Sequence, residues 1–196
     1  DDKKTFQQVN LFDNRFSQVL SQIAFTGYGS FPLSKFRSSP EFTTNGMLPK
    51  AWRRVKGEIY LYKGGTSGFA NTGKEPFSEF YSAQVAAAMG LDHIYYSLSL
   101  WKGQLCSTCK LFTSKEISFI PASTLMDTSR ITEIIAWYDR HGWKESLSDM
   151  LVFDAVIRNT DRHLGNFGFL VESHTNKLLQ PAPIFDNGLS LSLIHI

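Results

Sequence analysis

Three polar side chains towards the carboxyl end of the chain have the types and the order that phosphoryl transfer requires. Asp161 and Asn166 stand five residues apart in the segment NTDRHLGN, and Asp186 follows in the turn FDNG. Such a reaction needs a carboxylate that takes the acceptor's proton, and oxygen ligands for the cations that neutralise phosphate charge. Magnesium prefers hard oxygen donors and keeps several waters, so one carboxylate and one amide suffice beside the phosphates. We therefore predict Asp161 as catalytic base and Asn166 and Asp186 as magnesium ligands.

The neighbouring segments predict how these residues are positioned. Apolar residues recur at helical spacing from Glu145 to Arg158 and the rhythm stops at Asn159, so a helix should end just before the first motif. FGFLVE and LLQPAPIFD read as two short strands joined by the polar turn SHTNK. Asp, Asn and Gly are also ordinary loop formers, and either motif alone fits a plain turn equally well. Their conjunction, with helix, loop, hairpin and D-x-G turn in this order, favours a kinase centre.

A lysine in an apolar row is a candidate for the nucleotide phosphates. In GEIYLYKGG, alternation places Ile59, Leu61 and Lys63 on one face of a strand. A lysine on such a face either lies at the rim of the core, with its amine in solvent, or has an anionic partner. Both interpretations fit this strand taken alone.

The following segment offers a partner for Lys63. Pro76 to Gly90 has helical spacing, with Ser78 as a candidate cap and Gly90 at the end. Glu79 lies on a stripe of small residues that can pack closely against a sheet, so we predict that it orients Lys63. Glu75 is the second candidate, but it precedes a proline and is expected in the loop.

A glycine-containing turn upstream could expose backbone N–H groups to phosphate. The segment SPEFTTNGMLPK carries the candidates Thr43, Thr44, Gly46 and Lys50. It has neither the Walker A spacing nor the glycine pattern of ordinary protein kinases. An ordinary hairpin turn would use the same residues.

Taken together, these segments resemble the kinase core of the HipA-like bacterial serine/threonine kinases. NGMLPK resembles the phosphate loop of that family, IYLYK its nucleotide lysine, SEFYSAQVAAAMGL its conserved helix, NTDRHLGNFGF its catalytic loop and PIFDNG its metal-binding aspartate. The resemblance runs in the same order from about Ser39 to Ser190. It implies an α+β, two-lobed protein-kinase-like fold, with a β-rich amino lobe and a helical carboxyl lobe.

The resemblance also implies roles for individual residues. ATP contacts are expected from Lys63, with phosphate contacts from Thr44, Gly46 and Lys50, and Thr43 falls where relatives carry an autophosphorylated hydroxyl. The strand of the hairpin around Lys102 and Gly103 should lead into an interlobe hinge, where backbone groups bind adenine. That hinge is expected at Leu111, Phe112 and Thr113.

The resemblance divides the chain into an amino lobe, residues 1–112, and a carboxyl lobe, residues 113–196. ITEIIAWYDRHG predicts a helix in the second lobe, capped by Asp127 or Thr128 and ended at Gly142. The sequence stops ten residues beyond Asp186, where the family continues into further helices. We therefore expect the carboxyl lobe to look truncated.

Composition narrows the classes of partner. The 196 residues are 42% hydrophobic and 19% charged, enough for a sizeable core, and a net charge of +2 gives no support for direct nucleic-acid binding. No stretch approaches the roughly 18 apolar residues of a membrane span, and the polar start is unlike a signal, so a cytoplasmic location is expected. Cys106 and Cys109 lack the second pair of a zinc site, and we expect two reduced structural cysteines.

Three functions compete on this sequence. The first is an ATP- and magnesium-dependent kinase that modifies a Ser/Thr hydroxyl of a protein, with an antitoxin-like protein as a further partner implied by the resemblance. The second is a non-catalytic nucleotide-binding or interaction module. The third is a metallophosphoesterase using Asp161, His163 and Asp186, which the remaining histidines do not support because they lie in no metal motif. We prefer the kinase.

Overall fold

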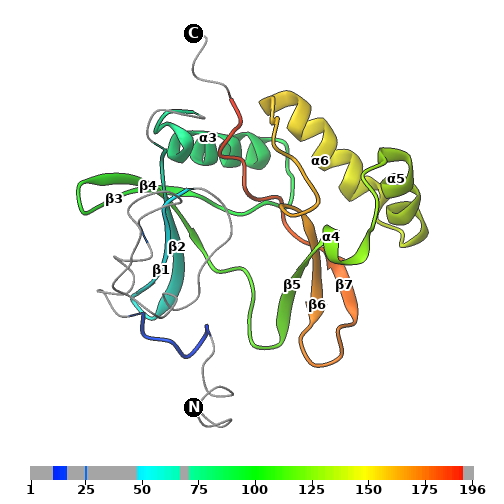
Figure 1. Cartoon of the computed structure of the whole chain (residues 1–196), viewed down its shortest axis with the longest axis horizontal. Coiled ribbons are helices and arrows are strands. Elements are labelled where there is room, and N and C mark those ends of the chain that lie inside the picture. The colour runs from blue at the N-terminus through cyan, green and yellow to red at the C-terminus, as the bar shows by residue number, and fades with distance from the viewer. Residues whose placement is uncertain (1–10, 17–24, 26–47, 67–70, 192–196) are drawn as a thin grey trace. The chain divides into compact units, whose positions relative to one another are not determined.

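The computed structural model describes residues 11–16, 25, 48–66 and 71–191, which belong to two compact units (Figure 1). The first unit combines Asp1–Pro76 with Ser97–Leu111, and the second combines Phe77–Tyr96 with Phe112–Ile196. Both contain antiparallel sheets, and helices lie beside the sheet of the second. The α+β class is therefore confirmed, and each unit is described by itself below.

The first unit contains a four-stranded antiparallel sheet in the order β1-β2-β4-β3. Both of its hairpins turn through two residues with positive φ, Lys56-Gly57 and Lys102-Gly103, which suits the twist of the paired strands. The hairpin predicted around Lys102 and Gly103 is confirmed. The strands are β1 Lys50–Val55, β2 Glu58–Gly64, β3 Ser97–Trp101 and β4 Gln104–Lys110.

Helix α3 spans Glu75–Ala88, close to the predicted limits. Two expectations about its start were wrong. Glu75 is the first helical residue rather than a loop residue, because its buried carboxylate accepts hydrogen bonds from the backbone N–H and the hydroxyl of Thr66. Ser78 lies inside the first turn, fully buried, and is not the cap. Gly90, with φ of 71°, ends the helical path as predicted.

The second unit contains the three-stranded antiparallel sheet β5-β6-β7, formed by Ile117–Pro121, Gly168–Glu172 and Leu178–Pro181. The hairpin predicted between the two motifs is β6-β7, so this expectation is confirmed. Gly168 pairs with Pro121, and a Cβ atom there would lie 2.1 Å from the carbonyl oxygen of Ile120. Only glycine lets β6 start this close to β5, directly after the Asn166 motif.

Helices α4 (Ala122–Leu125), α5 (Ile131–Arg140) and α6 (Lys144–Ile157) complete the second unit. The predicted cap of α5 was wrong: Arg130 occupies the N-cap without a side-chain bond, and the Thr128 hydroxyl accepts the Arg130 N–H instead. Helix α6 ends at Ile157, and the C-cap residue Arg158, with φ of 53°, turns the chain out of the helix just before the first motif. The prediction of that helix end is therefore good to one residue.

Two apolar clusters hold these elements in place. One joins α5, α6 and the sheet through buried side chains that include Tyr138, Met150 and Phe169. The other joins α3 to α6 through Ala86, Phe153 and Ile157. Most of α3 therefore groups with the carboxyl-terminal elements, whereas the predicted division at residue 112 placed it in the first lobe. That division stays a prediction.

The cysteines and the lengths of the helices complete the description of these residues. Cys106 and Cys109 are both buried and no disulfide joins them, as expected. None of the helices described here is both long and apolar enough to cross a membrane.

Candidate functional site

The loop that follows α6 is shaped by Asn159. Its backbone N–H donates to the Asp154 carbonyl at 2.8 Å, and its Nδ2 donates to Asp154 Oδ1 at 2.9 Å. Its Oδ1 accepts the backbone N–H of Asp161 at 3.1 Å. Asn159 therefore anchors the loop to the last turn of α6 and sets the direction of the chain at Asp161. The Asp161 side chain is exposed, which suits a base that must meet an incoming hydroxyl.

Asn166 closes the loop back onto Asp161. Its side chain is only 3% exposed, its Nδ2 donates to the Asp161 carbonyl at 2.6 Å, and its Oδ1 accepts the His163 N–H at 3.0 Å. The chain thus curls between the two residues as the motif predicted. An amide oxygen has two lone pairs and the His163 bond uses one, so the second fits a hard cation.

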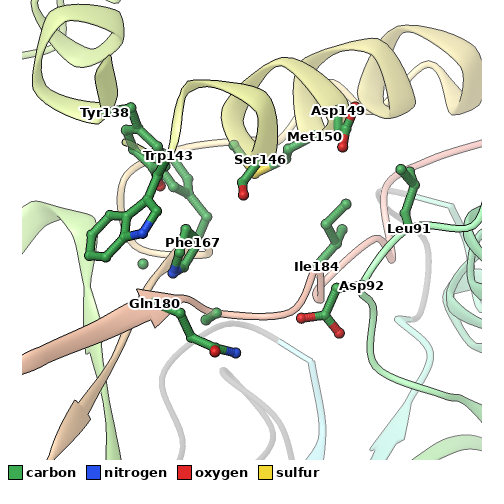
Figure 2. Close-up of a pocket in the computed structure, with 13 residues that line it drawn as sticks. Leu91, Asp92, Tyr138, Trp143, Ser146, Asp149, Met150, Phe167, Gln180 and Ile184 are labelled. Atoms are coloured by element: carbon green, nitrogen blue, oxygen red, sulfur yellow. The ribbon is translucent and has the colours of Figure 1, made fainter. Parts of the chain in front are cut away.

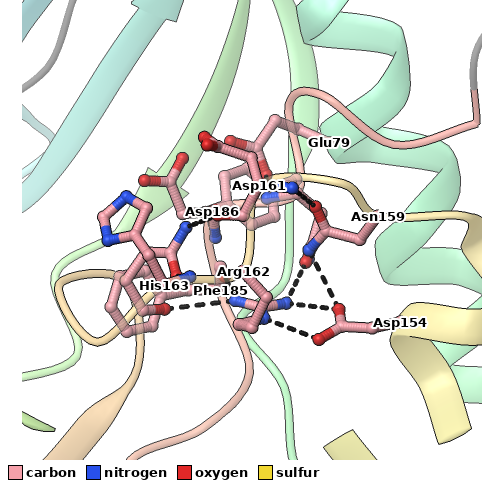
Figure 3. A network of polar contacts seen from close by, with 11 residues as sticks. Glu79, Asp154, Asn159, Asp161, Arg162, His163, Phe185 and Asp186 are labelled. Atoms are coloured by element: carbon pink, nitrogen blue, oxygen red, sulfur yellow. Dashed lines mark hydrogen bonds and ion pairs between the residues drawn. The ribbon is translucent and has the colours of Figure 1, made fainter. Parts of the chain in front are cut away.

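Arg162 connects this loop to the turn that carries Asp186 (Figure 3). Its Nε and Nη2 each donate to the Asp154 carboxylate at 2.8 Å, a bidentate pair whose side chains are 8% and 9% exposed. Its Nη1 donates to the carbonyls of Asn166 at 3.1 Å and Phe185 at 2.8 Å, and Nη2 also donates to Asn187 Oδ1 at 2.7 Å. The guanidinium therefore ties the end of α6 to both motifs.

Asp186 lies between two anchored neighbours. The Phe185 carbonyl binds Arg162, and the Asn187 N–H donates to Glu79 Oε2 on α3 at 3.0 Å. Asp186 itself has a φ of 59°, a left-handed conformation that aspartate tolerates better than most residues, and its N–H lies 3.4 Å from the Tyr96 hydroxyl. Glu79, which is fully buried, thus holds the turn that carries Asp186 through a backbone contact. Sequence analysis did not foresee this contact.

An aromatic cluster supports the same turn. Phe112, Phe119 and Phe185 pack with ring centroids 5.3–5.8 Å apart. Phe112 is one of the three predicted hinge residues, and its ring packs against Phe185, the residue before Asp186. Of the other two, the Leu111 N–H donates to the Ile59 carbonyl at 2.9 Å in the first unit, and Thr113 follows Phe112 directly.

The remaining predicted nucleotide residues belong to the first unit. Lys63 on β2 is 3% exposed, so the interpretation that places its amine in solvent at the rim of the core does not hold. Lys50 begins β1 opposite Lys63 in the register. Thr43, Thr44 and Gly46 lie outside the described residues. The roles of these residues, and the pairing of Lys63 with Glu79, stay predictions.

The metallophosphoesterase interpretation finds no support in the described part of the chain. No group of three or more His, Cys, Asp or Glu side chains there is arranged to hold a metal. His163 Nδ1 accepts the Gly165 N–H at 3.0 Å, so this histidine braces its own loop. One carboxylate with one amide is a donor set for magnesium held together with phosphate oxygens.

Sequence reasoning missed Arg162, Asp154 and Asn187, although one signal was present. Asp154 continues the buried stripe of α6 formed by Leu147, Met150 and Ile157. A carboxylate on a buried stripe needs a cation, and Arg158 and Arg162 both follow it closely in the sequence. The bonds of Arg162 to residues 23 and 25 positions away had no comparable signal.

Comparison with known proteins supports the predicted kinase-like fold. The serine/threonine-protein kinase CtkA of Helicobacter pylori (strain J99 / ATCC 700824) is 29% identical over 131 residues, 59% of this chain and 40% of CtkA. The crystal structure of the H. pylori proinflammatory kinase CtkA matches with a TM-score of 0.62 at 25% identity, covering 72% of this chain and 55% of that one. The chain is therefore similar to a HipA-like kinase in sequence and in fold.

A HipA structure agrees at the level of the fold. The Shewanella oneidensis MR-1 toxin–antitoxin complex of HipA, HipB and operator DNA matches with a TM-score of 0.53 at 11% identity, covering 80% of this chain and 46% of that one. No family model matches the chain. The chain spans less than two thirds of the length of each of these proteins. The predicted resemblance to the HipA-like kinases and the kinase-like fold are both confirmed.

Proposed function

We propose that this HipA-like chain transfers the γ-phosphoryl group of ATP, with magnesium, to a Ser/Thr hydroxyl of a protein. The observation that carries the proposal is the Arg162 network, which holds the Asp161–Asn166 loop and the Asp186 turn in one hydrogen-bonded unit. A phosphotransferase must keep its base and its metal ligands in register, because positioning and electrostatics supply most of its catalysis. The similarity to CtkA, a serine/threonine-protein kinase by name, supports the acceptor class.

The proposed chemistry assigns one task to each group. Asp161, exposed and oriented through Asn159, accepts the proton of the acceptor hydroxyl. The Asn166 amide oxygen and the Asp186 carboxylate are the proposed magnesium ligands. When bound, magnesium neutralises the charge that develops on the phosphate oxygens. Arg162 does not touch the reacting atoms in this scheme and acts as a positioning residue.

The nucleotide contacts are proposed for the remaining predicted residues. Lys63 binds the phosphates and Glu79 orients it, with further phosphate contacts from Thr44, Gly46 and Lys50. Backbone groups at Leu111, Phe112 and Thr113 bind adenine. The HipA structure contains HipB, so an antitoxin-like protein is proposed as a second partner, to be sought by affinity purification and identified by mass spectrometry.

A transfer assay tests the proposal. The chain is incubated with radiolabelled ATP, magnesium and dephosphorylated casein, and compared with Asp161→Asn. Loss of the base should lower incorporation by about 10²- to 10⁴-fold. Asp139→Asn is the matched control, because Asp139 is exposed on α5 and pairs only loosely with Lys144 at 3.8 Å. It should retain full activity.

Two outcomes would contradict the assignment. Equal incorporation by Asp161→Asn and the native chain would remove Asp161 from the base role. Binding of ATP without any transfer would favour the non-catalytic nucleotide-binding module instead. Mapping of the phosphorylated residue in the same experiment tests Thr43 as an autophosphorylation site.

A further inference from the structure

The second unit contains a cavity of about 310 Å³ that the proposed phosphoryl transfer does not use (Figure 2). Its walls come from the segment after α3, from α5 and α6, and from the start of β6 and the end of β7 with their neighbouring residues. The volume is at the lower end of the range for small-ligand sites. It suits a single side chain better than a nucleotide.

Most of the wall is apolar and aromatic. Tyr138, Met150, Phe167 and Ile184 line it, and Trp143 stands at its edge with its ring stacked on Phe169 at 5.5 Å. Trp143 is half-buried, so its packing against Phe169 fixes the ring while part of its surface stays accessible. Such a wall accepts a hydrocarbon stem and offers aromatic faces to a cation.

The charge of the cavity has one sign. Asp92 and Asp149 line it from different elements, the first after α3 and the second on α6, and Figure 2 shows them on two sides of Ile184. Both side chains are exposed, and within the described residues neither carboxylate has a hydrogen bond or an ion pair. No lysine, arginine or histidine is among the lining residues. A phosphate-bearing ligand would be repelled, whereas a cation would be attracted.

We propose that this cavity binds an arginine or lysine side chain of a partner polypeptide. The methylene stem lies against the apolar wall, and the charged end reaches Asp92 and Asp149. Arginine is preferred over lysine, because its planar guanidinium binds carboxylates bidentately, stacks on aromatic rings and is more weakly hydrated. The proposal goes beyond the kinase activity and does not depend on it.

Two lining residues of the cavity are close in the sequence to the two chemical motifs. Phe167 directly follows Asn166, and Ile184 stands two residues before Asp186. A side chain held in the cavity therefore contacts the stems of the catalytic loop and of the metal-ligand turn.

Binding of N-acetyl-arginine amide tests the proposal without nucleotide. The probe is titrated at low ionic strength into ¹⁵N-labelled protein, and the indole N–H signal of Trp143, assigned with Trp143→Phe, is followed. We expect a saturable shift that weakens as salt is raised. N-acetyl-citrulline amide, which has the same shape without the charge, should bind at least threefold more weakly.

Variants of the two carboxylates test whether they bind the charged end of the probe. Because both carboxylates are exposed, Asp92→Asn and Asp149→Asn should each weaken the arginine probe by up to about fivefold without changing the rest of the spectrum. Asp139→Asn, with the same change in net charge outside the cavity, should have no effect. Equal binding of the arginine and citrulline probes would overturn the proposal. So would stronger binding of N-acetyl-leucine amide, or unchanged affinity in both variants.

Discussion

Replacement of Arg162 by methionine should destabilise the second unit far more than its position in a loop suggests. The change removes the cation from the buried Asp154 carboxylate and leaves the carbonyls of Asn166 and Phe185 without their donor. Breaking a buried ion pair by removing one partner costs about 3–5 kcal/mol. Domains are stable by only about 5–15 kcal/mol, so the variant should be close to unfolding at ambient temperature. Arg162→Lys keeps the positive charge but loses the bidentate guanidinium, so its stability should lie between those of the native chain and of Arg162→Met.

The assay is urea unfolding followed by far-ultraviolet circular dichroism, with stability obtained from the midpoint and slope. Arg130→Met is the matched control, because its ion pair with Glu133 is exposed (80% and 51%) and should contribute no more than about 1 kcal/mol. The double variant Asp154→Leu/Arg162→Met should lose less than the sum of the two single variants, since no charge is then buried alone. Additive losses, or a loss below about 1 kcal/mol for Arg162→Met, would refute the positioning role.

Two further predictions concern the packing of each unit. Gly168→Ala should lower the free energy of unfolding by about 1–3 kcal/mol or more, because the added Cβ meets the Ile120 carbonyl. Gly103→Asn should change it little, because the space there is open and asparagine tolerates the turn conformation. Thermal unfolding compares the two variants with the native chain. Burial raises the pKa of the Cys106 thiol from 9.0 to about 11. The folded state therefore favours the protonated thiol, and this contribution is complete below pH 9 and is lost as pH rises towards 11. The fall in melting temperature between pH 8 and 11 should be steeper for the native chain than for Cys106→Ala, and equal slopes would contradict the assignment.

Local patterns were sufficient for the elements that carry the motifs. Helical spacing located α3 and α6 to within one or two residues, and two short strands around a polar turn located the β6-β7 hairpin, whereas the β3-β4 hairpin was placed with the help of the family resemblance. These signals are strong because one face of each element is buried, so sequence period and burial coincide. The curl from Asp161 to Asn166 was likewise predictable from the motif, because both partners lie within one loop.

Contacts between distant segments could not be predicted in the same way. Arg162 received no role from the sequence, and only the fold shows that it meets Asn187 and the Phe185 carbonyl. Glu75 precedes a proline and was expected in the loop, yet its bonds to Thr66 place it in the first turn of α3. In both cases the tertiary partner decides the conformation, and a single sequence carries little information on such partners.

Calorimetric titration with ATP, with and without magnesium, tests the central claim most directly. The account predicts magnesium-dependent binding that is lost in Asp186→Ala, whose side chain is the proposed metal ligand, and retained in the control Asp139→Ala. Circular dichroism of the same samples establishes that each variant is folded. Absence of ATP binding in a folded native sample, or equal magnesium-dependent binding in Asp186→Ala, would contradict the account.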